Sequence, residues 1–301
     1  MSIVKRFGFH LLALFVIVCW GLTPISTKVL YDHGMGPWAV LVLRVVLAYG
    51  VLIFISPKIV YAGTPRDEGL CVLLGLTLVP VYYGLQNIAL DIGSASTVAI
   101  ASTMAPILIG AVAVALFRKP VHWLMGLGAC AAATGRVILG FDSCVIQEMP
   151  LAVIGWSLGA AAGFALYSML LRAAGDLPPL LMLRKSMGYG LLGAFPFYYT
   201  EFKTEAFLLT DPVVLGNLLF LSVGALAICW ALWHVVTRNI GASAAGIWSY
   251  FAPVATILGG IFILNESISY IGIMGGTMII CGVICAQTGL AKIAMDVARR
   301  F

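Results

Sequence analysis

The sequence predicts an all-α integral membrane protein with ten transmembrane helices arranged as two inverted five-helix repeats. The first observation is the composition, because 62% of the 301 residues are hydrophobic and only 10% are charged. The second is that the apolar residues fall into ten long runs with short polar segments between them. The third is that residue patterns in the first half of the chain recur in the second half.

The composition excludes most classes of water-soluble protein. Soluble domains contain about 45–50% apolar and about 25% charged residues, whereas the mean hydropathy of this chain is +1.07. Its polar residues are too few to cover a globular surface, so a soluble enzyme, a disordered chain and a nucleic-acid binder are not expected. The seven cysteines are scattered and form no CxxC pattern. We interpret them as packing residues and expect no metal site.

Ten apolar runs, bounded by charged residues or by glycine and proline, have the lengths expected of helices that cross a bilayer. Lys5 and Arg6 precede the first run, but that run continues past Trp20 without a small-residue cleavage site, so we expect an uncleaved first span. The expected spans are residues 8–30, 37–55, 69–90, 94–116, 122–139, 151–171, 179–198, 213–236, 242–264 and 270–289.

Lysine and arginine orient these spans, because they concentrate in the cytoplasmic loops of membrane proteins. If the N-terminus is cytoplasmic, the outer loops contain only Lys203. The inner segments then contain Lys5, Arg6, Lys58, Arg66, Arg118, Lys119, Arg172, Arg238, Lys292, Arg299 and Arg300. We therefore expect both termini to lie in the cytoplasm.

An internal repeat divides the chain into residues 1–144 and 145–301, each with five expected spans. The matched residues, at a constant offset within each group, are Ala95, Ser96, Ala105 and Pro106 with Ala242, Ser243, Ala252 and Pro253, and Arg44, Tyr49 and Gly50 with Arg184, Tyr189 and Gly190. Five is an odd number, so the two halves must cross the membrane in opposite directions. Inverted repeats of this kind build many secondary transporters, with the substrate site near the midplane between the halves.

The repeated residues also resemble the motifs of the EamA-type transporters of the drug/metabolite transporter superfamily. The similar segments are Cys19-Trp20-Gly21 with Lys28, Phe164–Tyr167 with Arg172, Ala95–Pro106, Ala242–Pro253 and Leu264–Glu266. The resemblance as a whole covers about residues 8–289. One departure is that the first repeat has Lys119 where the second has Glu266. The resemblance implies a multi-pass transporter in the plasma membrane, which is the inner membrane in a Gram-negative cell.

Charged residues inside the expected spans are few. All acidic residues fall in loops, in tails or at span edges, so we do not expect proton antiport through a buried carboxylate. Arg44 and Arg184 each lie a few residues inside a span, where they could be scaffold residues that reach the interface, contact a substrate carboxylate or latch a gate. Pro106 and Pro253 interrupt helical hydrogen bonding and are candidate hinges.

The candidate binding site consists of polar and aromatic residues at matching places in the two halves. Tyr83, Gln86 and Asn87 have the spacing of one helix face, and Trp230, Trp233 and His234 match them. Such a face suits a cavity better than lipid, although helix packing or an interfacial belt is the alternative. The expected substrate-binding residues are Trp20, Thr23, Tyr83, Gln86, Asn87, Phe164, Tyr167, Trp230, Trp233, His234, Trp248 and Tyr250.

A cavity with this lining suits a small amphipathic solute, since ring faces accept apolar groups or cations and the amides and hydroxyls bond a polar head. We expect a carrier that exports amino acids or related metabolites. The alternative is a multidrug or quaternary-amine transporter. No enzyme motif occurs, and we expect neither catalytic residues nor a cofactor. The expected partners are a small-molecule substrate and the lipid bilayer, without nucleic acid, for a monomer or a weak homodimer.

Overall fold

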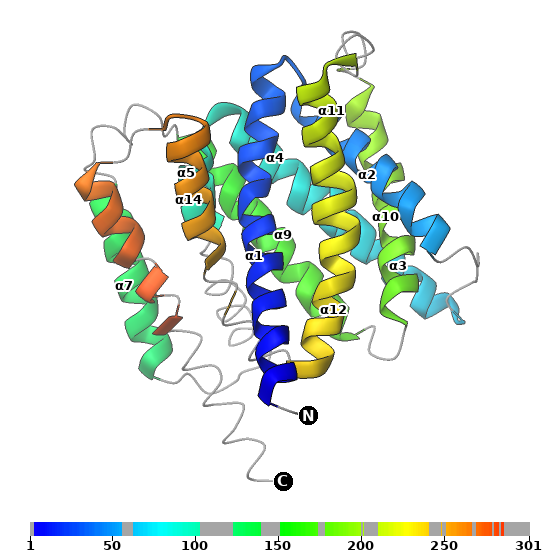
Figure 1. The fold of residues 1–301 in the computed structure, drawn as a ribbon, viewed down its shortest axis with the longest axis horizontal. Helices are drawn as coiled ribbons and strands as arrows, with labels where there is room; N and C mark the ends of the chain where they lie inside the picture. The colour runs from blue at the N-terminus through cyan, green and yellow to red at the C-terminus, as the bar shows by residue number, and fades with distance from the viewer. Residues whose placement is uncertain are drawn as a thin grey trace.

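The helices lie side by side in a bundle, and α1 (Ile3–Asp32) stands between α14 on one side and α11 and α12 on the other (Figure 1). The structure is a computed structural model that describes residues 3–55, 63–102, 123–139, 151–173, 178–199, 201, 210–240, 248, 251–266, 269–278, 280–282 and 284–285. No strand occurs among these residues.

The described helices fall within or overlap the ten expected spans. In the first half they are α1, α2 (Pro37–Ile55), a continuous helix made of α3 (Pro65–Leu76), η1 (Thr77–Gly84) and α4 (Leu85–Ile92), then α5 (Ala95–Ser102) and α7 (Trp123–Leu139). In the second half they are α9 (Leu151–Ala173), α10 (Pro179–Tyr198), a second continuous helix made of α11 (Pro212–Leu219), η3 (Phe220–Ile228) and α12 (Cys229–Ile240), and α14 (Phe251–Ile263). Residues 270–278 are also helical.

Five of the described helices are long and apolar enough to cross a membrane, which agrees with a multi-pass membrane protein. They are Phe7–Asp32, Pro37–Ile55, Pro65–Ile92, Leu151–Leu171 and Pro212–Trp233. The predicted bounds of the second and seventh spans agree with α2 and α10. Much of the fourth, ninth and tenth expected spans lies outside the described residues.

Helix starts combine local and distant caps. Thr64 accepts a hydrogen bond from the Asp67 N–H at the start of α3, and Asp211 accepts one from Val213 at the start of α11. In contrast, α2 and α5 are capped by carboxylates from the other half of the chain. Glu201 accepts from the N–H groups of the first turn of α2, and Glu266 accepts from those of α5. These caps hold the two halves together at helix ends.

Two π-helical segments, η1 and η3, interrupt the third helix of each half. Pro80 within η1 lacks an N–H and therefore cannot continue the α-helical hydrogen bonding. The sequence analysis predicted unbroken helices here. A π turn pairs residues five apart and depends on how the helix is held by its neighbours, which explains why it was missed.

Helices from opposite halves pack against each other throughout the bundle. α1 packs against α14 and α12, while α9 packs against η1, α4 and α5. α10 packs against α2 and α3, and α2 packs against η3. At Gly21 the backbones of α1 and α14 approach closely, because a Cβ atom there would lie 2.5 Å from the carbonyl oxygen of Ala252. The main hydrophobic core joins α2, α3, η1, α10 and η3.

Candidate functional site

Aromatic rings from α1, α9 and α12 meet in the interior of the bundle. The ring centroid of Trp20 lies 5.3 Å from those of both Trp230 and Trp233. Tyr167 meets Trp230 edge-on at 6.4 Å, and Phe164 lies 6.2 Å from Tyr167. The structure therefore brings together five of the residues that the sequence analysis selected, on three helices from both halves.

The same series of rings continues onto η1 and ends at Tyr83, next to the Arg44 guanidinium. Phe164 lies 5.1 Å from Tyr82, which lies 4.7 Å from Tyr83. The guanidinium carbon of Arg44 stands 4.4 Å from the centroid of the Tyr83 ring. Tyr82 was missed because an α-helical spacing was assumed for this face, whereas η1 has wider turns. We call the rings from Tyr83 through Tyr82, Phe164, Tyr167, Trp230 and Trp20 to Trp233 the aromatic chain.

Three polar candidates on α1 and α4 have defined places. The Thr23 hydroxyl donates to the Trp20 carbonyl at 2.7 Å, so it bonds its own helix. Asn87 is buried and its Nδ2 donates to the Pro37 carbonyl at 2.9 Å, which ties α4 to the start of α2. Gln86 is half-buried on α4. The Asn87 amide is thus engaged in a hydrogen bond between two helices.

The remaining candidates lie apart from the ring contacts of Trp20 or outside the described residues. Trp248 donates from Nε1 to Nδ1 of His10 at 3.1 Å and shares a small apolar cluster with Trp233, toward the beginning of α1. Tyr250 and Pro106 lie outside the described residues. The same is true of the side chains of His234 and Pro253, whose backbones belong to α12 and α14.

The two arginines inside the spans are both buried, with 4% of their surface exposed. Next to Arg184 on α10, the Lys185 ammonium donates to Glu68 of α3 at 2.6 Å, and the Tyr189 hydroxyl donates to the same carboxylate oxygen. A carboxylate from α3 is thus paired with the residue that follows Arg184 on α10. Arg44 stacks on Tyr83 instead.

A separate open cavity of about 350 Å³ lies at the ends of α1, α4 and α14. Its lining residues are Lys28, Asp32, Asp91, Ile92, Gly93, Ser94, Leu264 and Glu266. The Lys28 ammonium donates to the Leu90 carbonyl at the end of α4, at 3.0 Å. This cavity was not predicted, although its acids stand at span edges in the sequence. In the described part of the chain, no group of three His, Cys, Asp or Glu residues could hold a metal ion.

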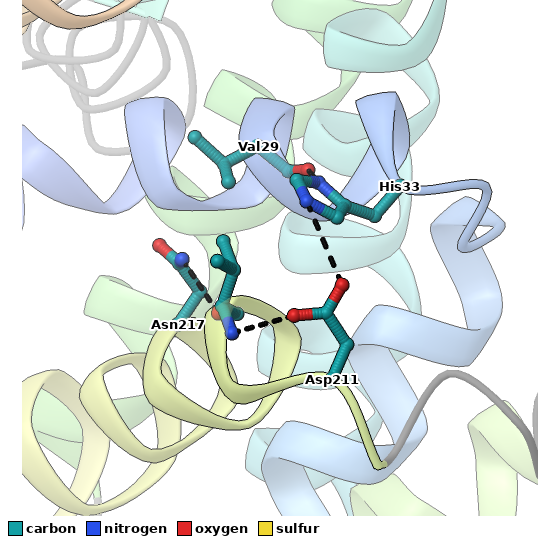
Figure 2. Close-up of polar contacts among 5 residues, drawn as sticks. Val29, His33, Asp211 and Asn217 are labelled. Carbon is teal, nitrogen blue, oxygen red and sulfur yellow. Dashed lines mark hydrogen bonds and ion pairs between the residues drawn. The ribbon is translucent and has the colours of Figure 1, made fainter.

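Polar contacts also join α1 to α11 at this end of the bundle (Figure 2). Nε2 of His33 lies 3.8 Å from Oδ2 of Asp211, whose other oxygen accepts from the Val213 N–H at 2.7 Å. Nδ1 of His33 donates to the Val29 carbonyl at 2.8 Å. Nearby, burial raises the pKa of the Glu201 carboxyl, while hydrogen bonds from the Ala39 and Trp38 N–H groups oppose that rise.

The comparisons with known proteins decide the family. The model of the EamA-like transporter family matches residues 8–141 and matches again over residues 151–287. The chain belongs to this family. The resemblance seen in its motifs is thereby confirmed, and the protein is an EamA-like membrane transporter with a match in each half.

Three similar proteins cover nearly the whole of this EamA-like chain. An uncharacterized transporter of Archaeoglobus fulgidus is 22% identical over 89% of this chain and 94% of its own. The uncharacterized transporter YvbV of Bacillus subtilis is 23% identical over 94% and 92%, respectively. A probable amino-acid metabolite efflux pump of Escherichia coli is 22% identical over 93% and 94%. A protein of known crystal structure matches 98% of this chain and 99% of its own, with a TM-score of 0.64 and 17% identity, and so has the same fold.

Proposed function

We propose that this EamA-like protein is a secondary transporter that exports small amphipathic metabolites, amino acids above all, by alternating access. The carrying observation is the aromatic chain, because it combines rings from both halves in the centre of the bundle. Rings that stack on an apolar side chain contribute about 0.5–1.5 kcal/mol each beyond their buried area. The name of the Escherichia coli relative supports the same substrate class. In this proposal the chain has no catalytic role.

The contacts between helices support two inverted five-helix repeats, residues 1–144 and 145–301. If α1 is exchanged with α9, its partners α14 and α12 become α5 and α4, and α9 does pack against α5 and α4. Likewise, the contact of α2 with η3 becomes the contact of α10 with η1. An exchange of this kind is what a two-fold axis between the halves produces, and the odd number of spans in each half puts that axis in the membrane plane. Rocking of the halves about Pro106 and Pro253 would then alternate access to the centre.

The same proposal includes ten spans in the plasma membrane, or the inner membrane of a Gram-negative cell, with both termini in the cytoplasm. It rests on the lysine and arginine distribution between loops. The end of the bundle that contains Asp211, Glu201 and the Lys28 cavity then faces outward. The transporter works as a monomer or a weak homodimer. Cysteine accessibility in intact cells tests the orientation, since an added cysteine at Lys203 should react with an impermeant reagent and one at Arg66 should not.

A second candidate function is the transport of quaternary amines or other organic cations. The observation that favours it is the group of Trp20, Trp230 and Trp233, whose ring faces could surround a cation. Proteoliposomes loaded with a metabolite panel separate the two candidates. Counterflow of amino acids supports the first, and counterflow of choline or tetramethylammonium without amino acids supports the second. Each assay is run with and without a pH gradient, and we expect substrate exchange to persist without the gradient.

The contribution of the aromatic chain is tested with Trp20→Ala and Trp230→Ala. Each change removes a stacking surface, and we expect apparent substrate affinity to fall by about five-fold or more. Trp156→Ala on α9 is the matched control, because Trp156 is 41% exposed at the surface of the bundle. Unchanged transport in both central variants would reject the site.

A further inference from the structure

Arg44 carries a buried positive charge that the described protein groups do not neutralise. Its side chain is 4% exposed, and its Nε atom is buried without a hydrogen-bond partner. Among the described residues, no carboxylate forms an ion pair with it. The guanidinium carbon lies over the Tyr83 ring at 4.4 Å. Stacking uses one face of the guanidinium plane and leaves the N–H groups at its edge available as donors.

Three carboxylates at the end of the bundle where α2 begins have partners other than Arg44. Glu201 accepts from the N–H groups of Trp38 and Ala39 at 3.0 Å each. Asp211 accepts from Val213 and faces His33 (Figure 2). Glu266 accepts from the Ala95 N–H and from the Ser96 hydroxyl. These carboxylates cap helices, and none of them is placed to pair with Arg44.

The counterpart in the second half is arranged differently. Arg184 matches Arg44 in the repeat, and on the same helix Lys185 and Tyr189 donate hydrogen bonds to Glu68. A carboxylate from α3 thus balances positive charge on α10. On α2 the corresponding place is next to the aromatic chain instead.

The depth of Arg44 in its span and the adjacent aromatic chain indicate which kind of ligand would bind there. Arg44 lies seven residues after Pro37, which is about 10 Å along α2, so it is beyond the interface. A guanidinium held there favours an anionic partner, and its fork geometry matches a carboxylate. The aromatic chain that begins at Tyr83 offers stacking surfaces to whatever is joined to that carboxylate.

We propose that Arg44 binds the carboxylate of the transported solute, whose apolar or aromatic body lies along the aromatic chain. This inference rests on the proposed transport function and narrows its substrate class to carboxylates with an apolar side chain. It also assigns Arg44 to substrate specificity rather than to the scaffold. Organic cations without a carboxylate are then poor substrates.

The test compares ligand pairs that differ only at the carboxylate, namely L-phenylalanine with L-phenylalaninamide and L-leucine with L-leucinamide. Binding to the purified protein in detergent is followed by the ligand-dependent rise in Tm, and transport by counterflow in proteoliposomes. We expect the wild-type protein to bind each acid about ten-fold more tightly than its amide. In Arg44→Gln the acids should weaken about ten-fold while the amides do not change, and Arg44→Lys should retain part of the preference. Arg66→Gln is the control, because Arg66 is exposed at the start of α3.

Each outcome of this test is decisive. Equal binding of acid and amide by the wild-type protein overturns the inference, and counterflow of either ligand would still support the transport function. A preference for the acids that persists in Arg44→Gln overturns the assignment to this residue. If the wild-type protein neither binds nor transports any of the four ligands, both the inference and the proposed amino-acid class are overturned. If Arg44→Gln does not fold, the acid and amide ligands are compared in the wild-type protein and in Arg44→Lys, and this comparison still tests the inference.

Discussion

The indole Nε1–H of Trp20 donates to the backbone carbonyl of Ala225 at 3.0 Å, across 205 positions of sequence. Ala225 lies in η3, where the Cys229 N–H bonds to the Gly224 carbonyl five residues earlier. The Ala225 carbonyl is thereby released from the partner that an α-helix would supply, four residues later. The π segment thus provides the acceptor that orients the central tryptophan, which is a use of π turns often found at functional sites.

Trp20→Phe should separate this hydrogen bond from the ring stacking. The phenyl ring still contacts Trp230, but the Ala225 carbonyl loses its donor, which costs about 1–3 kcal/mol for a buried group. We expect Tm in detergent to fall by several degrees, with a smaller loss of substrate affinity than in Trp20→Ala. Trp156→Phe, at a surface position, is the control. Equal changes of Tm in Trp20→Phe and Trp156→Phe would contradict a stabilising role for the hydrogen bond from Trp20 to Ala225.

Gly21→Ala should push α1 away from α14. The added Cβ would lie 2.5 Å from the Ala252 oxygen and 2.7 Å from the Ala255 Cβ, and neither atom can move without its backbone. The 2.6 Å hydrogen bond from the Thr256 hydroxyl to the Gly21 carbonyl would be strained as well. We expect a loss of about 1–3 kcal/mol, measured as a lower Tm. Gly155→Ala has no atom within 4 Å of its new Cβ, so its Tm should be equal or higher.

Glu201 should show an inverted pH dependence. Burial raises its pKa in the folded protein, so the folded state takes up the proton more readily than the unfolded state. The ionised carboxyl therefore lowers stability above the folded pKa, and this loss is relieved as the pH falls through that pKa. Glu201→Gln keeps an acceptor for the α2 cap and should be at least as stable as wild type at pH 7. The difference in Tm should shrink as the pH is lowered.

Glu201→Ala is the contrasting variant. It leaves the Trp38 and Ala39 N–H groups without their acceptor, and loss of a cap costs about 0.5–2 kcal/mol. Its Tm should lie below those of both the wild type and Glu201→Gln at every pH tested. If alanine and glutamine behave alike, the carboxyl does not serve as a cap.

Lys185→Met should destabilise the contact between α3 and α10. Lys185 and Glu68 are 13% and 15% exposed, so the Glu68 carboxylate would lose its cationic partner while it remains largely buried. Breaking a fully buried pair costs about 3–5 kcal/mol, and we expect a smaller loss here because water reaches this pair. The double variant Glu68→Gln with Lys185→Met should recover part of the Tm. Additive losses would show that the two residues are not coupled.

Local patterns explain which parts of the fold were predictable. The bounds of α2 and α10 follow from apolar runs that begin at Pro37 and Pro179, because proline is favoured in the first turn of a helix. The family resemblance likewise rested on short motifs in the sequence, and the family match confirmed it. The π segments were not predictable in this way. They depend on the neighbours that hold each helix, and so does the inclusion of Tyr82 in the aromatic chain.

For the site, the sequence by itself determined the membrane class, the kinds of side chain available and their matching places in the two halves. Hydrophobicity and helical spacing are local properties, so they can be derived from the order of residues. Only the tertiary structure decided which groups meet. It engaged Asn87 in a bond to Pro37, set Trp248 against His10, paired Lys185 with Glu68, and placed Arg44 over the Tyr83 ring without an ion pair among the described residues. Charge balance depends on distances between helices that are remote in sequence, so the order of residues alone does not determine which arginine or lysine meets a carboxylate.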